Sequence, residues 1–404
     1  MSETAPGSGT SVDAPIDVPV DVLVIGGGIH GAGVLQAAAA AGHSALLVEE
    51  RAIAFGTSSR SSKLIHGGLR YLETLQFGLV RESLAERSIL LRIAPHLVRL
   101  VPFFLPIYRG TTRRPWEIRA GLSLYALLGG LSSDARFARV PRAQWTDLDG
   151  LATEGLEAVF RYHDAQTDDA ALARAVVRSA AELGANVVCP GRFVEAARAG
   201  EGYEVRLEEG GRERVLHART LVNASGPWID EVQRRIAGSP APLAIELVQG
   251  AHVELEGELR RGVYYAEAPD RRAVFLMPWK GHTLVGTTET PFAGDPDDVR
   301  ATPEEIEYLE NTLRRYFPRH SARRLDAWAG LRVLPRGSGR AFDRPRDVTF
   351  LCDRPRAPRL VAIYGGKLTG YRATAAKVLG LLRASLPPAR READTATLPL
   401  PQES

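Results

Sequence analysis

The spacing of apolar and polar positions changes along the 404-residue chain, and it first predicts a strand, a helix and a second strand. A β-branched apolar run ends in three glycines at 20–28, an alanine-rich stretch follows at 31–42, and a second apolar run occupies 44–50. Short β-branched runs are typical of strands, and the alanine-rich stretch favours a helix. The ordered part of the chain therefore begins with a strand–helix–strand unit whose first turn is built from glycine.

Further along the chain, helical spacing alternates with groups of short strand-like runs. Apolar residues at helical spacing predict helices at 75–100, 170–185, 303–317 and 370–386. Asp168 and Asp169 suit the start of the second of these helices, and Gly184 suits its end. The strand-like runs at 186–228 indicate a β-meander that returns to the main sheet, and those at 243–289 indicate a larger antiparallel sheet.

The most membrane-like piece of the sequence is GLSLYALLGGL, from Gly121 to Leu131. We interpret it as a short buried helix with a glycine stop, in preference to an anchor that lies in a membrane interface. No other stretch is apolar for long enough to cross a bilayer.

Composition narrows the class of protein. Charged residues make up 25% of the chain and hydrophobic residues 45%, which suits an enzyme with a sizeable core and two folding units. The net charge of +3 is small and the arginines are scattered, which argues against a nucleic-acid-binding face. Cys189 and Cys352 lie far apart and outside any CxxC motif, so neither a disulfide framework nor a zinc site is expected. Residues 1–19, rich in Ser, Pro, Gly and Asp, predict a disordered tail and no secretory signal.

Gly26, Gly28 and Gly31 form a GxGxxG motif between the first predicted strand and the helix that follows it. Glycines at these positions let the backbone approach a pyrophosphate at the positive end of a helix. Glu49 ends the second strand, where a carboxylate accepts hydrogen bonds from ribose hydroxyls. Its neighbour Glu50 fits a solvated turn better. The motif predicts a dinucleotide site but does not by itself separate FAD from NAD.

The segment at 56–73, GTSSRSSKLIHGGLRYLE, combines small hydroxyl residues, a lysine, a histidine and two adjacent glycines. It resembles the corresponding segment of FAD-dependent glycerol-3-phosphate dehydrogenases, within the wider group of D-amino-acid-oxidase-like flavin oxidoreductases. The likeness recurs in order at VNASGPW (222–228), MPWKGHTLVGTTE (277–289), AGLRVLP (329–335), PRDVTFL (345–351) and YGGKLTGYR (364–372). It therefore covers nearly the whole ordered chain.

The resemblance implies an α/β protein in which a Rossmann-like FAD-binding domain is interleaved with an antiparallel-sheet (α+β) substrate domain. We expect the FAD-binding domain at 20–100, 155–240 and 330–385, and the substrate or cap domain at 101–154 and 241–329. A C-terminal tail is expected at 386–404.

The cofactor implied by the resemblance is FAD. The residues expected to bind it come from the glycine motif, the second strand and the family-like segments, and they are Gly26, Gly28, Gly31, Glu49, Thr57, Ser58, Ser62, Lys63, Leu64, Gly67, Gly68, Val194, Ala224, Gly226, Gly366, Lys367, Leu368 and Thr369.

The implied reaction is the oxidation of sn-glycerol 3-phosphate to dihydroxyacetone phosphate, by hydride transfer to flavin N5. Such a reaction needs a base for the hydroxyl proton and positive charge near the reduced flavin. His66 and His252 are the candidate bases, and Lys367 is the candidate cation. The substrate is expected to contact Arg70, Tyr71, Arg332 and Arg346, because arginine suits a phosphate dianion.

Three positions depart from the family pattern near the expected substrate pocket: Gln249, Ala251 and Gly370. We also expect the chain to lack the C-terminal helical domain that is typical of longer members. A related FAD-dependent oxidase of an amino or hydroxy acid and a non-catalytic flavin-binding subunit therefore stay open as alternatives. We expect a cytoplasmic protein that passes electrons to a quinone or another acceptor, with contact to the inner face of the cell membrane as an open alternative.

Overall fold

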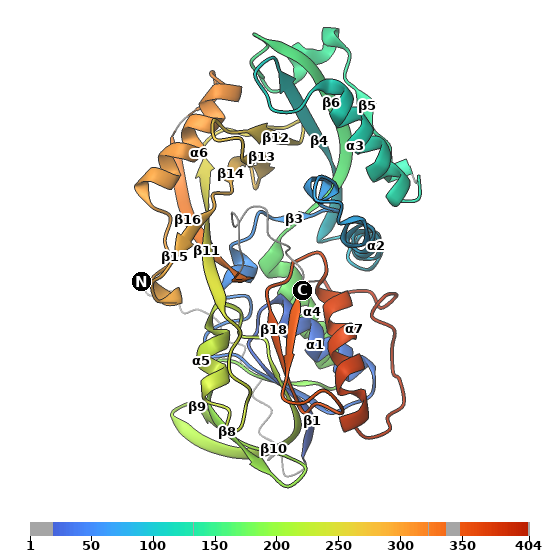
Figure 1. The fold of residues 1–404 in the computed structure, drawn as a ribbon, viewed down its shortest axis with the longest axis vertical. Helices are drawn as coiled ribbons and strands as arrows, with labels where there is room; N and C mark the ends of the chain where they lie inside the picture. The colour runs from blue at the N-terminus through green and yellow to red at the C-terminus, as the bar shows by residue number, and fades with distance from the viewer. Residues whose placement is uncertain (1–18, 132, 322, 337–347, 403–404) are drawn as a thin grey trace, which may run out of the picture.

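Two β-sheets lie one above the other along the long axis of the molecule, each with its own helices (Figure 1). The computed structural model describes residues 19–131, 133–321, 323–336 and 348–402. Among the described residues, eight strands form the lower sheet and ten form the upper sheet. The chain crosses between the two sheets several times, so the two parts are interleaved in sequence, as predicted.

The first sheet is built around β1 (Val20–Ile25), which pairs in parallel with β2 (Ala45–Val48) and β10 (Arg212–Asn223). The order continues from β2 to β7 (Asn186–Val188), and from β10 to β18 (Leu360–Tyr364) and β17 (Thr349–Cys352). β8 (Arg192–Ala199) and β9 (Gly202–Glu209) form an antiparallel meander that returns through β10. The predicted meander and α/β fold are confirmed.

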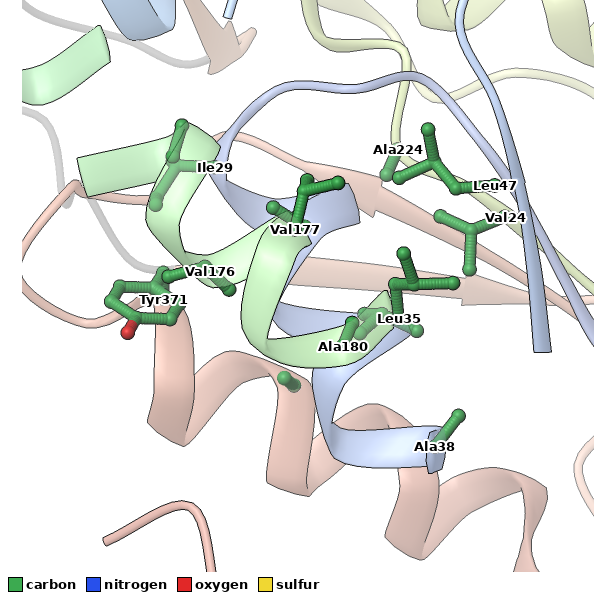
Figure 2. Packing of buried hydrophobic residues seen from close by; sticks show 14 of the residues in the cluster. Val24, Ile29, Leu35, Ala38, Leu47, Val176, Val177, Ala180, Ala224 and Tyr371 are labelled. Carbon is green, nitrogen blue, oxygen red and sulfur yellow. The ribbon is translucent and has the colours of Figure 1, made fainter. Parts of the chain in front are cut away.

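Helix α1 (Ile29–Ala40) packs against both α4 (Asp169–Glu182) and α7 (Tyr371–Leu382), as Figure 2 shows. Small side chains permit this close packing: a Cβ added at Gly33 would lie 2.7 Å from the Tyr371 ring. The same apolar cluster includes Val24 of the sheet. Helix α1 is therefore buried nearly all round, which fixes the direction in which its first turn points.

The second sheet is mostly antiparallel, as predicted, although β4 and β12 pair in parallel. Its strands run in the order β15 (Thr290–Phe292), β11 (Ile245–Leu255), β14 (His282–Gly286), β13 (Ala273–Trp279), β12 (Val263–Glu267), β4 (Val98–Tyr108), β6 (Leu156–Thr167) and β3 (Leu64–Ile65). β16 (Arg324–Pro335) pairs along β11, and β5 (Ala138–Arg139) pairs with β6.

Where the sequence contains helix-capping residues, the helices of the structure begin or end at them. Asp168 caps α4 by accepting a hydrogen bond from the Ala171 N–H, and Gly184 follows the helix in the left-handed region. The helix predicted at 303–317 is α6 (Pro303–Tyr316), which opens with a capping box between Thr302 and Glu305. The short α5 (Ile229–Arg234) was not predicted.

The helix predicted at 75–100 is shorter in the structure. α2 (Phe77–Ile93) ends early, and β4 begins at Val98, so that Pro102 lies inside a strand. Pairing of β4 with β6 along its length outweighs the helical spacing of this stretch. Tertiary pairing therefore decided this boundary.

The segment from Gly121 to Leu131 forms the end of a longer helix, α3 (Pro115–Leu128), and the turn after it. Leu122 and Tyr125 are buried, but Leu127 and Leu131 are 60% and 63% exposed. The predicted burial therefore holds for one face of the helix only. In the part of the chain that the structure describes, no helix has the length and apolar character needed to span a bilayer.

Sheet membership departs from the expected domain ranges at several places. β3, β6 and half of β16 fall in ranges expected for the FAD-binding domain, but all three strands pair within the second sheet. The domain boundaries themselves stay a prediction.

A buried ion pair fixes the family-like segment at 56–73 to the start of α4. The Lys63 ammonium lies 2.6 Å from Asp169, and both side chains are almost fully buried. The same carboxylate accepts hydrogen bonds from the backbone N–H and the hydroxyl of Ser61. A buried charge left without its partner is strongly destabilising, so this contact holds the segment in place.

We predict that Lys63→Met lowers the free energy of unfolding by about 3 to 5 kcal/mol, because it leaves the Asp169 carboxylate buried without its cation. Urea unfolding of FAD-free protein, followed by circular dichroism, measures the change. Lys377→Met is the matched control, because Lys377 pairs with Glu82 on the exposed surface. It should change stability by less than about 1 kcal/mol. Equal effects of the two substitutions would contradict the prediction.

Candidate active site

A cavity of about 530 Å³ is lined by residues of both sheets. The first sheet contributes the turn after β1, the end of β2, the connection after β10 and the loop between β18 and α7. The second sheet contributes residues of β11 and β16, and the family-like segment at 56–73 contributes most of its length. The predicted motifs, which are far apart in the sequence, therefore meet around one space.

The GxGxxG turn depends on glycine at two of its three positions. Gly26 has a φ of +106°, and a Cβ there would lie 2.7 Å from the Ala224 carbonyl oxygen. A Cβ at Gly31 would lie 1.9 Å from the carbonyl oxygen of Gly26. Gly28 differs, because it has an ordinary extended backbone, lines the cavity and has only Ser58 Oγ within 4 Å of an added Cβ. This open cradle fits a dinucleotide pyrophosphate at the start of α1.

Glu49 stands beside this turn, at the end of β2, as predicted. Its carboxylate accepts hydrogen bonds from the backbone N–H groups of Gly27 (2.7 Å) and Arg51 (2.9 Å). Two fixed donors orient the carboxylate and leave it further acceptor capacity for ribose hydroxyls.

Hydroxyl groups of the segment at 56–73 connect the two sheets around the cavity. Ser58 Oγ accepts a hydrogen bond from the Ile29 N–H at the start of α1 (2.9 Å). Thr57 Oγ1 donates to the Leu331 carbonyl of β16 (2.7 Å). These contacts explain why small hydroxyl residues gather in this segment.

The HGG part of the segment lies against the loop that precedes α7. The backbone N–H of His66 donates to Thr369 Oγ1 (3.2 Å), which joins two family-like motifs. The next N–H, that of Gly67, donates to the Tyr125 hydroxyl, which in turn donates to the buried Asp164 carboxylate (2.6 Å). The backbone that carries His66 is thus held from both sides.

Tyr71 and Lys367 meet at the cavity. The Lys367 ammonium lies 3.8 Å from the centre of the Tyr71 ring, and the Arg70 guanidinium lies 5.8 Å from it. Gly68 has a φ of +76°, and a Cβ there would lie 2.3 Å from that ring. Lys367, the predicted cation, therefore lies close to Arg70 and Tyr71, the predicted substrate contacts. Gly68, the second glycine of HGG, leaves space for the Tyr71 ring.

His252 projects from β11 and is fully buried at the wall of the cavity. Its Nε2 lies 3.0 Å from Ser62 Oγ, and its ring stacks on Trp328. Burial, and then the positive charges of Lys63 and Arg332, lower the pKa of His252 to about 3. The ring is therefore neutral near pH 7, which a proton acceptor requires.

Arg332 projects from β16 toward the same part of the cavity. Its Nη2 lies 3.1 Å from Thr287 Oγ1, and its Nη1 lies 3.5 Å from the Glu289 carboxylate. A Cβ at Gly250 would lie 2.7 Å from Nη2, so the guanidinium lies over a strand position that has no side chain. The guanidinium is thus oriented at the wall of the cavity by an uncharged hydroxyl and a carboxylate.

Sequence reasoning missed the residues that shape this wall. Gly250 makes room for Arg332, and Gly286 makes room for His252, because a Cβ at Gly286 would lie 2.1 Å from the imidazole ring. Glu289 belongs to the family-like segment at 277–289, but no role in the site was predicted for it. A glycine inside a strand often marks the close approach of another group, and that signal was available for both glycines.

Most of the predicted site residues line the cavity. These are His66, Arg70, Tyr71, His252 and Arg332, together with Gly26, Gly28, Glu49, Thr57, Ser58, Ser62, Leu64, Gly68, Ala224, Gly226, Gly366, Lys367, Leu368 and Thr369.

Four predicted cofactor residues are not part of the cavity wall. Gly31 and Gly67 act through close backbone packing, and Val194 lies next to the lining residue Phe193. The Lys63 ammonium forms the buried ion pair with Asp169. Arg346 lies outside the described residues.

The three departures from the family pattern also lie outside the cavity wall. The Gln249 side chain donates to Glu305 and to the Arg300 carbonyl, and Ala251 is buried in the apolar cluster beneath α6. Gly370 precedes α7 with nothing within 4 Å of an added Cβ. Side chains alternate along β11, so Gly250 and His252 face the cavity and the two changed residues face away. This corrects the expectation that the changes border the substrate pocket.

Comparison with known proteins agrees with this geometry. Residues 21–379 match the model of the family described as FAD dependent oxidoreductase. The chain belongs to this family. It is therefore an FAD-dependent enzyme, which settles the choice between FAD and NAD left open by the glycine motif.

Two relatives illustrate the range of the family. The chain is 39% identical to a glycerol-3-phosphate dehydrogenase of Pseudomonas aeruginosa, over 96% of this chain and 76% of that protein. It is 37% identical to a D-erythritol 1-phosphate dehydrogenase of Brucella abortus, over 91% of this chain and 74% of that protein.

A solved structure of glycerol-3-phosphate dehydrogenase from Bacillus halodurans, in complex with FAD, is similar to this one with a TM-score of 0.72 and 27% identity. The similarity covers 95% of this chain and 68% of that chain.

We predict that Gly28→Val folds normally but is purified without yellow colour. Its backbone conformation suits any residue, but the added side chain enters the space proposed for the pyrophosphate. Absorbance at the flavin bands measures bound FAD. Gly78→Val, at an exposed position near the start of α2, is the control and should keep its FAD. A yellow Gly28→Val protein with a normal flavin content would remove Gly28 from the cofactor site.

Proposed function

We propose that this enzyme oxidises sn-glycerol 3-phosphate to dihydroxyacetone phosphate. The observation that carries the proposal is the pairing of an oriented guanidinium with a neutral, buried imidazole on one wall of the cavity. Arg332 and His252 flank Gly250 from two adjacent strands, β16 and β11. A substrate with a phosphate next to an oxidisable carbinol needs these two groups within a few ångströms of each other.

Arg332 binds the phosphate in this proposal. Guanidinium and phosphate form charge-assisted hydrogen bonds, which are about twice as strong as neutral ones. Glu289, which lies 3.5 Å from the guanidinium, holds it in place between substrate molecules. Arg70 is proposed as a second contact with the substrate. Arg346, at a position outside the described residues, stays a predicted contact.

His252 accepts the hydroxyl proton in this proposal. Its Nε2 is engaged with Ser62, and its Nδ1 has no hydrogen-bond partner within the described part of the chain. The positive charge of Arg332 is one of the causes that lower the pKa of His252. A phosphate dianion at Arg332 offsets that charge, so substrate binding raises the basicity of the imidazole. Because His252 has this link to the phosphate site, we favour it over His66 as the base.

Bound FAD supplies the two-electron acceptor for the carbinol carbon. Lys367 places a positive charge at the loop before α7, in contact with the Tyr71 ring. We propose that this charge stabilises the negative charge that develops during the oxidation. The Tyr71 ring restricts where the ammonium can lie, so it acts as a positioning residue for Lys367.

D-Erythritol 1-phosphate is the second candidate substrate, favoured by the 37% identity to the Brucella enzyme. Both candidates carry a phosphate monoester next to a secondary alcohol, so Arg332 and His252 serve either one. The proposal for glycerol 3-phosphate is supported by the larger group of relatives with that name, at 36% to 39% identity.

We also propose a cytoplasmic location and electron transfer to a quinone or another acceptor. Trp116, Leu127 and Leu131, in and just after α3, expose large apolar side chains. Exposed apolar side chains of this size are typical of surfaces that contact a membrane or another protein. They support peripheral contact with the inner face of the cell membrane.

We predict that, without oxygen, glycerol 3-phosphate bleaches the yellow protein faster than D-erythritol 1-phosphate at equal concentration. Stopped-flow absorbance of the flavin measures reduction without any external acceptor. Glycine, proline and lactate serve as controls for an amino or hydroxy acid oxidase. Faster bleaching by D-erythritol 1-phosphate would replace the proposed substrate, and bleaching only by an amino or hydroxy acid would overturn the proposal. Lack of bleaching by every compound would favour the non-catalytic alternative.

We predict that Arg332→Ala lowers kcat/KM for the phosphorylated substrate at least about tenfold, because a charge-assisted hydrogen bond is lost. Bound FAD should not change, since Arg332 is not among the residues proposed to hold it. Arg324→Ala is the control on the same strand, where the side chain is exposed and pairs with Glu310. A normal kcat/KM for Arg332→Ala would exclude this arginine as the phosphate contact.

A further inference from the structure

His30 is a partly buried histidine, with both ring nitrogens shielded from solvent, that none of the predicted motif roles explains. It occupies the second position of α1, directly after the GxGxxG turn, and it lines the cavity. Neither of its ring nitrogens has a hydrogen-bond partner among the residues that the structure describes. A buried polar group without a partner costs about 1 to 3 kcal/mol. The ring is therefore expected to meet a partner that enters the cavity.

The surroundings of His30 favour the neutral form of its ring. Burial lowers its pKa to about 4, so the ring is neutral near pH 7. A neutral imidazole carries one N–H donor and one nitrogen acceptor. Its partner must therefore offer groups that both accept and donate hydrogen bonds, which hydroxyl groups do.

The position of His30 between two backbone features indicates which part of the cofactor it meets. On one side is the Gly26–Gly28 turn, whose open cradle fits the pyrophosphate. On the other side is the loop before α7: a Cβ at Gly366 would lie 2.2 Å from His30 Nε2. That loop also carries Lys367, which we assign to the flavin. In FAD, the group that connects the pyrophosphate to the flavin ring is the ribityl chain, with three hydroxyl groups.

We propose that His30 binds the ribityl chain of FAD by hydrogen bonds to its hydroxyl groups. The imidazole donates from one ring nitrogen and accepts at the other, and the ribityl hydroxyls satisfy both. Gly366 is needed because a side chain there would displace the ring. The proposal rests on FAD binding, which the family establishes, and is independent of the proposed substrate.

This contact is tested by comparing how FAD and FAD analogues bind to the wild type and to variants of the protein. FAD and three analogues, each lacking one ribityl hydroxyl, are titrated into FAD-free protein, and quenching of flavin fluorescence gives each Kd. For the wild type, at least one analogue should bind about fivefold or more weakly than FAD, since it leaves a ring nitrogen unsatisfied. For His30→Leu, that same analogue should bind within about twofold of FAD, because the partner of the missing hydroxyl is gone.

His43→Leu is the matched control. His43 lies just after the other end of α1 and does not line the cavity. His43→Leu makes the same change of side chain as His30→Leu. It should show the wild-type preference for every ligand. Persistence of the full analogue penalty in His30→Leu would overturn the proposal. Equal binding of all four ligands by the wild type would overturn it without any variant, so the test does not depend on how His30→Leu folds.

Discussion

Close backbone contact at glycine positions is the constraint on which the rest of the structure depends. The connections that follow β1, β10 and β18 all begin at one edge of the parallel sheet. A side chain at Gly26 would meet the Ala224 carbonyl, and one at Gly366 would meet the His30 ring. Ligands of α/β sheets bind at the carboxyl ends of the strands, where such connections meet. Glycine at these contacts lets three distant parts of the chain enclose one cavity.

Ion pairs and burial together determine how charge is arranged around that cavity. Lys63 is neutralised by Asp169, and Arg332 lies close to Glu289, so neither cation is left alone. A protonated His252 would add a third positive charge beside both, and its pKa is lowered first by burial and then by these two charges. The site thus keeps its imidazole neutral and its guanidinium charged at the same pH. A substrate that brings a phosphate and a carbinol makes use of both states.

Strand geometry explains why changes in sequence near the site leave its wall intact. Side chains alternate between the two faces of β11, so Gln249 and Ala251 pack toward α6 while Gly250 and His252 face the cavity. Proximity in sequence to His252 therefore says little about proximity to substrate. A change at Gly250 would matter more, because a side chain there would displace the guanidinium of Arg332.

The sequence by itself determined the local elements and the class of cofactor site. Its β-α-β pattern, Gly31 and Glu49 act through contacts within about 25 residues, where backbone sterics dominate. Only the tertiary structure decided that β4 replaces the last turns of a predicted helix, that the Lys63 ammonium pairs with Asp169, and that His30 lines the cavity. These outcomes depend on pairing and burial between segments far apart in the chain, and the spacing of residues in one segment carries no information about its distant partner.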